Sequence, residues 1–400
     1  MHQERKKPIA RATDNVRPAL YSLAALVLCA AAAFGQTEEF RTNPNAGPSG
    51  VIVHSKFGGQ IYGFDIDQNG TEGLLSEAQD ISGGNVLAAV ETFDQSTGNI
   101  VKVVSELQSK DDYITHGVVG RSVGLVEREH VSGIFVSKRI YQTLNPLQGN
   151  KFTGMWTPPI GSDYIIMPGG VSRNQGEPNV AVFAYDNSGN FIPEVFSSNV
   201  AANTFGPVVK ITDSNNFGSV PPPIAYDFVT NQAILGGGNG CFGCHPVVGL
   251  VDLSTGAFSE FTSIGFGFVN GMAVDSADGI FCMATEDDAN LEFYTLPNLS
   301  GFNVELPGSG GQQIFSGADV EFDPVHKVFL IAQPVSSSSS SGSTIYVYDT
   351  QGNLKETLNG FSFSNAFNVV PMHIALHPGS RSGFVDGPDG SVTELQSFTY

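Results

Sequence analysis

The chain has little basic charge and few cysteines. Its 400 residues contain 19 Lys and Arg against 39 Asp and Glu, which gives a formal net charge of −20. A protein this acidic repels phosphate backbones and anionic lipid headgroups, so we expect no nucleic-acid partner and no binding to anionic membrane surfaces. With only four cysteines in the chain, two of them closely spaced beside a histidine are an informative motif.

Long helical patterns and long apolar runs are also missing. Beyond the N-terminal region, no segment is apolar for long enough to cross a bilayer, so we expect no transmembrane segment in the mature chain. No long stretch repeats apolar residues with the 3.6-residue period of a helix. Short β-rich runs instead alternate with turns of Gly, Asn, Asp and Ser, which predicts an all-β protein.

The N-terminus has the pattern of a secretory signal peptide. Basic residues between Arg5 and Arg17 precede an apolar stretch from Ala19 to Ala33, and small residues at Ala33 and Gly35 favour cleavage before Gln36. Residues 1–35 are therefore predicted to be a signal peptide, and the protein is predicted to be periplasmic or extracellular. Cleavage would change the formal charge from −20 to −23, because it removes five basic and two acidic residues.

One turn pattern recurs along the chain. A strand ends at an aspartate and a tight turn rich in Gly, Ser and Asn follows, because the Asp side chain can accept local backbone N–H bonds and Gly adopts positive φ. The examples are Phe64 to Gly70, Phe93 to Gly98, Tyr185 to Gly189, Val251 to Gly256 and Tyr348 to Gly352.

A second pattern recurs at intervals of about 50 residues, which is typical of β-propeller blades. It is a short strand of small apolar residues that ends in a polar turn. Its members are Ile224 to Asp227, Met272 to Asp275, Val320 to Asp323 and Ile374 to His377. The 365 residues that would follow cleavage correspond to roughly seven blades at this period, with six as the alternative.

The last repeat is incomplete. It runs from Met372 to Tyr400, and we expect strands near Val51 to Phe64 to complete it, so that N- and C-terminal strands pair and close the propeller. Residues 36–400 are thus predicted to be a single propeller domain with an irregular lead-in at 36–50. The serine-rich run at 336–342 is predicted to be a flexible loop between two strands of one blade.

The segment from Cys241 to His245 fits the C-x-x-C-H pattern of c-type haem attachment, in which two thiols bond the haem and the histidine ligates iron. The motif follows a glycine-rich stretch and precedes a predicted strand. No helices are available to wrap a haem. The alternative is a disulfide or two free thiols in this loop, with His245 as a polar loop residue. Cys282, on a strand, is expected to pack as a small apolar side chain.

The strand from Asn270 to Asp275, followed by Asp278 to Ala284, resembles the repeat of NHL-type and gluconolactonase-like propellers. That resemblance implies a divalent metal in the central channel, held by carboxylates and an asparagine where inner strands begin. Asn270 matches such a position, and Asp319 and His373 occupy nearby strand starts in later repeats. No residue matches the family's N-terminal glutamate ligand. The alternative is that Asn270 opens a turn and Asp319 accepts hydrogen bonds from backbone amides.

Three functions remain open at this point. The first is a monomeric binding or scaffold protein that presents loops and a channel mouth to a small molecule or a protein partner. It is favoured because no complete catalytic constellation is evident in the repeats. The second is a metal-dependent lactonase or related hydrolase with metal at Asn270, Asp319 and His373. The third is electron transfer through haem at Cys241, Cys244 and His245.

Overall fold

The structure is a computed structural model. It describes residues 40–67, 70–81, 85–109, 112–119, 123–132, 135–144, 154–156, 164–173, 179–186, 192–199, 204–211, 223–237, 244–285, 290–307, 318–333, 344–361, 373–387 and 394–400. The chain divides into residues 1–39 and a body at Phe40–Tyr400. The predicted signal peptide, Cys241 and the serine-rich run at 336–342 lie outside the described residues.

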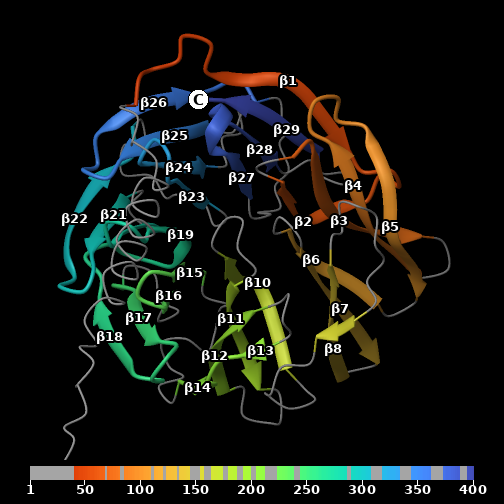
Figure 1. Cartoon of the computed structure of the whole chain (residues 1–400), viewed down its shortest axis with the longest axis horizontal. Helices are drawn as coiled ribbons and strands as arrows, with labels where there is room; N and C mark the ends of the chain where they lie inside the picture. The colour runs from red at the N-terminus through yellow and green to blue at the C-terminus, as the bar shows by residue number, and fades with distance from the viewer. Residues whose placement is uncertain are drawn as a thin grey trace, which may run out of the picture. The chain divides into compact units, whose positions relative to one another are not determined.

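Antiparallel sheets make up the described body, in which no α-helix occurs and no helix could cross a membrane. The sheets follow one another in chain order (Figure 1). Their strands, in spatial order within each sheet, are β2 (Gln60–Ile66), β3 (Glu72–Ile81), β4 (Asn85–Asp94) and β5 (Ile100–Ser109); β6 (Asp112–Val119), β7 (Val123–Ser132), β8 (Phe135–Leu144) and β9 (Gly154–Trp156); β10 (Tyr164–Arg173), β11 (Asn179–Asp186) and β12 (Ile192–Asn199), with β13 (Thr204–Phe205) and β14 (Val209–Lys210) both on β12; β15 (Ile224–Asp227), β16 (Gln232–Gly236), β17 (Val247–Asp252) and β18 (Phe258–Thr262); β19 (Val269–Asp275), β20 (Ile280–Thr285), β21 (Asn290–Thr295) and β22 (Ser300–Glu305); β23 (Asp319–Asp323), β24 (Val328–Gln333), β25 (Thr344–Asp349) and β26 (Leu354–Leu358); and β27 (Ile374–His377), β28 (Ser382–Gly387), β29 (Glu394–Thr399) and β1 (Gly47–His54).

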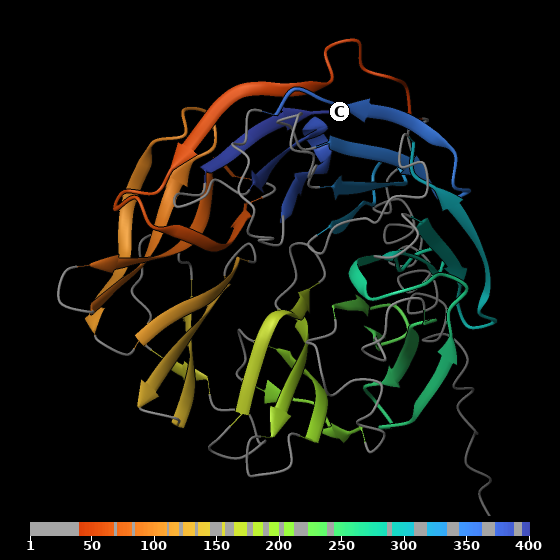
Figure 2. The same ribbon diagram turned by 180° about the vertical axis from the view of Figure 1, so that it is seen from behind.

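The expected pairing of N- and C-terminal strands is present. β1 pairs with β29 antiparallel, with Gly47 opposite Thr399 and His54 opposite Glu394. The two strands lie side by side in both views (Figures 1 and 2). β1 begins at Gly47, inside the stretch predicted to be an irregular lead-in, because its first residues already pair with β29. The second half of the predicted N-terminal segment forms β2 and starts another sheet.

The first strands of the sheets contact one another in succession. β2 contacts β6, β6 contacts β10, and the contacts continue through β15, β19 and β23 to β27, which in turn contacts β2. All four predicted small-apolar strands are such first strands: β15, β19, β23 and β27. The fold is therefore all-β and resembles a β-propeller.

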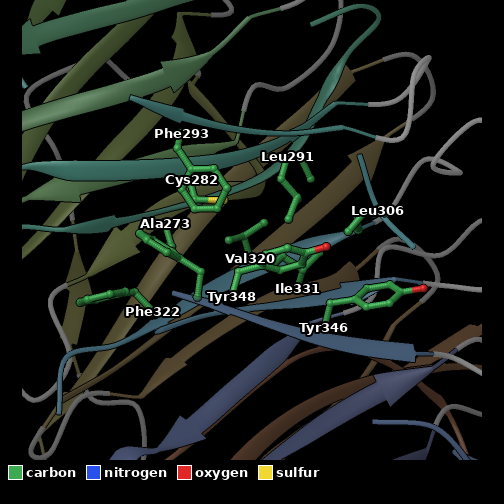
Figure 3. Close-up of a cluster of buried hydrophobic side chains, with 13 residues drawn as sticks. Ala273, Cys282, Leu291, Phe293, Leu306, Val320, Phe322, Ile331, Tyr346 and Tyr348 are labelled. Carbon is green, nitrogen blue, oxygen red and sulfur yellow. The ribbon is translucent and has the colours of Figure 1, made fainter. Parts of the chain in front are cut away.

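Side chains from successive sheets form the core. Figure 3 shows one such cluster, in which Cys282 and Phe293 of one sheet pack against Val320, Ile331 and Tyr348 of the next. Cys282 is a free, fully buried thiol among apolar neighbours, as predicted. Burial of each large apolar side chain contributes about 1.5–3 kcal/mol, so packing between sheets stabilises the arrangement of the first strands.

The aspartate turns form as predicted wherever they are described. The Oδ1 atom of Asp252 accepts hydrogen bonds from Ser254 N at 2.8 Å and Thr255 N at 3.0 Å. Asp94 accepts the equivalent pair from Ser96 N and Thr97 N, each at 2.9 Å. The glycines that end these turns, Gly98 and Gly256, have φ of 74° and 77°.

Candidate functional site

The residues predicted to hold a metal lie where three consecutive first strands begin. Asn270 is the second residue of β19, Asp319 is the first residue of β23, and His373 directly precedes β27. The short apolar strands fix these positions, since their buried side chains set the register of each strand.

Backbone contacts bring these strand starts together. Asp319 Oδ2 accepts a hydrogen bond from Ile374 N at 3.0 Å, which joins β23 to β27. Asp319 Oδ1 accepts a second bond from Val320 N at 2.9 Å. On the other side, a Cβ placed on Gly271 would lie 2.8 Å from the Cα of Asp319, so β19 approaches β23 as closely as only glycine permits. Asp319 thus bonds backbone amides, as the second interpretation of this residue expected.

His373 is held by a carboxylate of its own sheet. Its Nδ1 lies 2.8 Å from Asp386 Oδ2, and its backbone N–H donates to Asp386 Oδ1 at 2.5 Å. Burial acts to lower the pKa of His373, but the charges of Asp386 and Asp319 and the hydrogen bond to Asp386 outweigh it and raise that pKa to about 9. The imidazole is therefore a cation at neutral pH.

Burial acts in the opposite direction on Asp319. It raises the pKa of this carboxyl to about 6, against the lowering effects of His373 and of the two backbone N–H donors. Asp319, His373 and Asp386 thus form a hydrogen-bonded and charge-paired cluster that links β23, β27 and β28 (Ser382–Gly387). Its bonds hold strand starts in place.

Asn270 differs from the other two predicted ligands. Its Nδ2 atom is buried without a hydrogen-bond partner. Among the described residues, no three His, Cys, Asp or Glu side chains are grouped so that they could hold a metal ion. The structure thus places Asn270, Asp319 and His373 at the starts of neighbouring strands, but it gives Asp319 and His373 partners within the protein.

The described part of the C-x-x-C-H segment contains a disulfide-bonded cysteine. Cys244 is in a disulfide, and a sulfur in a disulfide is not free to form a thioether with haem. This observation fits the disulfide alternative for the loop. Cys241, the other cysteine of the motif, lies outside the described residues.

A neighbouring loop packs against Cys244 and His245. His245 Nδ1 lies 2.8 Å from Gly265 O, and the imidazole packs on the Phe266 ring with centroids 4.3 Å apart. Gly267 N donates to Cys244 O at 2.8 Å. The loop at residues 263–267, which leads directly into β19, is therefore tied to the segment at residues 244–246.

The buried glutamates were missed by the sequence analysis, and two of them occupy equivalent places in their sheets. Glu292 on β21 and Glu91 on β4 are fully buried. Each is on the third strand of its sheet, and each accepts a backbone N–H from the loop that precedes the first strand. A signal was present: Leu291-Glu292-Phe293-Tyr294 and Val90-Glu91-Thr92-Phe93 place an acid in the same position of two apolar strands.

All of these features share one edge of the sheets. In an antiparallel sheet of four strands, the first and third strands begin at the same edge, where the fourth strand ends. The starts of β19, β23 and β27, the segment before β17 and the loop at residues 263–267 therefore belong to this edge. We call this end of the sheets, where the first strands begin, the first-strand edge.

Comparisons with known proteins bear on the fold alone. The chain is similar to the crystal structure of Raptor from Chaetomium thermophilum, with a TM-score of 0.53 and 10% sequence identity. The similarity covers 89% of this chain but 29% of Raptor, so the chain spans less than a third of that protein. No family model and no curated protein matches the sequence. The resemblance to NHL-type and gluconolactonase-like propellers stays a prediction.

Proposed function

We propose that the protein is an exported, seven-bladed β-propeller that acts as a binding or scaffold protein for a small molecule or a protein partner. The succession of contacts from β2 through the first strands to β27 and back to β2 supports a closed ring, and the pairing of β1 with β29 supports its closure. The signal-peptide pattern at residues 1–35 supports export.

The observation that carries this proposal is that the polar groups of the cluster at Asp319 already bond other groups of the protein. Both of its carboxylate oxygens accept backbone N–H groups, and His373 is paired with Asp386. Side chains that are hydrogen-bonded in this way hold the starts of the strands in position. Strands that are held rigidly at one end are suited to presenting loops to a partner.

The first-strand edge also exposes apolar side chains beside the disulfide. Phe266 and Ile264 are 38% and 42% exposed, and Phe266 is fixed in place by its contact with His245. An ordered aromatic side chain binds a partner at a small entropic cost. We therefore place the partner-binding loops at this edge.

Site-specific photo-crosslinking tests the proposal. A photoreactive phenylalanine analogue replaces Phe266 at the first-strand edge. In two control proteins the same analogue replaces Phe228 or Phe302. Phe228 is 42% exposed in the turn between β15 and β16, at the opposite edge, and Phe302 is 42% exposed on β22, the fourth strand of its sheet. We expect a discrete adduct from position 266 alone when the protein is irradiated in its cell of origin. Equal adducts from all three positions, or none from 266, would contradict the placement of a protein partner at this edge.

The unpartnered Asn270 amide favours a second candidate, the metal-dependent lactonase-like hydrolase. Because the amide nitrogen and oxygen of an asparagine are exchanged by a flip of the side chain, the same atom position could present an oxygen ligand. Asn270 and Asp319 would then hold the metal, with His373 beside them. Metal analysis of gently purified protein together with lactone hydrolysis tests this candidate, and failure of both rejects it.

Electron transfer through haem is the remaining alternative. It requires Cys244 as a thioether, so it competes directly with the disulfide. A visible absorption spectrum of protein made with haem-maturation machinery decides between them: a Soret band that is lost when both motif cysteines are replaced by serine would establish covalent haem.

A further inference from the structure

Two sheets share a device in which a buried glutamate holds the loop that leads into the first strand. In the sheet that begins with β19, Ile264 N donates to Glu292 Oε2 at 3.1 Å. In the sheet that begins with β2, Lys56 N donates to Glu91 Oε2 at 2.9 Å. The loop at residues 55–59 is thus the counterpart of the loop at residues 263–267.

The two devices differ in the side-chain hydroxyl groups that bond the carboxylate. Two residues after Glu292, Tyr294 donates its hydroxyl to Glu292 Oε2 at 2.5 Å, and Ser263 Oγ lies 3.3 Å from Oε1. Two residues after Glu91 stands Phe93, which has no hydroxyl. Glu91 Oε1 is buried without a partner. The carboxylate of Glu292 is therefore fully bonded, whereas that of Glu91 is not.

A second buried carboxylate lies beside Glu91. Glu77 on β3 accepts hydrogen bonds from Phe57 N at 3.2 Å and from Gly59 N at 2.8 Å. Because Leu75 is paired with Glu91 across the two strands, Glu77 stands on the same face, one diagonal step away. Three amides of one loop therefore depend on two neighbouring buried carboxylates.

Burial is the largest effect on Glu91. It raises the pKa of Glu91, the Lys56 N–H lowers it, Glu77 raises it and the Lys56 charge lowers it, with a result of about 7. A buried charge with one unpartnered oxygen, next to a like charge, is unfavourable unless it is neutralised by a proton.

Other charged groups stand on the elements around Glu91. The adjacent strand β5 carries Lys102 and Glu106, both exposed. β6, which contacts β4, carries Asp112 and His116. The last sheet packs on the same face through Phe384, whose ring centroid lies 5.4 Å from that of Phe93.

That last sheet carries two more charged groups near the face. Its Asp386 is already paired with His373, and its Glu394 faces His54, with 3.7 Å between His54 Nδ1 and Glu394 Oε2. Each of these carboxylates is thus paired with a histidine. The charges that shift the pKa of Glu91 are those of Glu77, which raises it, and Lys56, which lowers it.

We propose that uptake and release of a proton by Glu91 controls whether the loop at residues 55–59 stays closed at the first-strand edge. With Glu91 protonated, repulsion from Glu77 is absent and the loop amides bind the carboxyl groups. When the proton leaves, a second negative charge is buried beside Glu77, one of its oxygens has no hydrogen-bond partner, and the loop opens to admit water. The loop at residues 263–267 stays closed at either pH because Tyr294 and Ser263 compensate Glu292.

Amide hydrogen exchange of the whole chain at pH 6 and pH 8.5, corrected for intrinsic exchange rates, tests this proposal. The closed loop binds the proton more tightly than the open one, so closure weakens as pH rises towards 7. With an ordinary Glu pKa in the open loop, protection of the amides of residues 56–59 should fall about tenfold between the two pH values. Protection of residues 263–267 should not change.

Matched substitutions exchange the behaviour of the two loops. Glu91→Gln and Phe93→Tyr, the latter copying Tyr294, should abolish the pH dependence at residues 56–59. Tyr294→Phe should create it at residues 263–267. Wild-type protection that does not vary with pH, or a pH dependence that persists in Glu91→Gln, would overturn the proposal. Should Phe93→Tyr fail to fold, Glu91→Gln and Tyr294→Phe still decide it.

Discussion

At the scale of single residues, Asp386 determines the charge of His373. The pKa of His373 is raised to about 9 chiefly by this carboxylate and its hydrogen bond, against the lowering effect of burial. Because the pKa lies above the ordinary value, the ion pair stabilises the fold below about pH 6.5. This contribution is lost as pH rises through about 9.

Replacing Asp386 with Asn should therefore lower the pKa of His373 by more than one unit, because the amide keeps hydrogen-bonding capacity but carries no charge. An NMR titration of the His373 ring protons measures the change. Asp278→Asn, which removes an exposed carboxylate paired with Lys327, is the control and should leave that titration curve unaltered. An unaltered curve in Asp386→Asn would show that the paired charge is not the cause.

At the scale of elements, the turns were predictable and the buried glutamates were not. An aspartate followed by Ser, Thr and Gly has few alternatives to the turn observed at Asp252, because the required hydrogen bonds are local. A glutamate in a strand, in contrast, is expected to face solvent. Glu91 is buried because residues 55–59, far away in sequence, cover it. No local pattern contains that contact.

The turn at Gly256 permits a test of its backbone conformation. Gly256 has φ of +77°, and a Cβ there would meet only Val209 Cγ2 at 3.7 Å. Gly256→Ala should therefore lower the free energy of unfolding by about 1–2 kcal/mol through the left-handed backbone rather than through a clash. Denaturant unfolding measures it.

Gly379 provides the matched control for that substitution. It lies in a 3₁₀ turn at Pro378–Ser380, is exposed, lacks a positive φ, and a Cβ there would meet nothing within 4 Å. Gly379→Ala should leave stability within about 0.5 kcal/mol of wild type. Equal losses in the two variants would mean that the conformation of Gly256 is not responsible.

At the scale of the whole molecule, the repeat predicted the succession of sheets but not which residues would meet. The resemblance to gluconolactonase-like propellers placed Asn270, Asp319 and His373 near the starts of strands in three repeats, and the structure has them at the starts of neighbouring first strands. Whether such residues ligate a metal or bind each other depends on bonds such as that from Asp319 to Ile374 N, which join different sheets. Partners of this kind follow from the assembled fold and not from the spacing.

The chain's final residue joins the last two sheets, and it allows a test of whether the body unfolds as one unit. Tyr400 is fully buried, and its hydroxyl donates to Asp323 Oδ2 at 2.8 Å across the two sheets. Tyr400→Phe should lower the free energy of unfolding by about 1–3 kcal/mol, because it removes a bond to a buried charge. Tyr226→Phe, which removes a bond within one turn, should have a smaller effect.

The single tryptophan, Trp156, reports on a distant sheet, since it lies on β9. If the sheets form one cooperative ring, Tyr400→Phe should shift the denaturant midpoint of Trp156 fluorescence as far as that of the far-ultraviolet circular dichroism. If the ring is open and its ends unfold separately, the circular dichroism transition will broaden while the Trp156 midpoint stays at the wild-type value. Coincident shifts therefore require that loosening the contact between Tyr400 and Asp323 destabilises strands more than 200 residues away in sequence, as expected when all the sheets unfold as one cooperative unit.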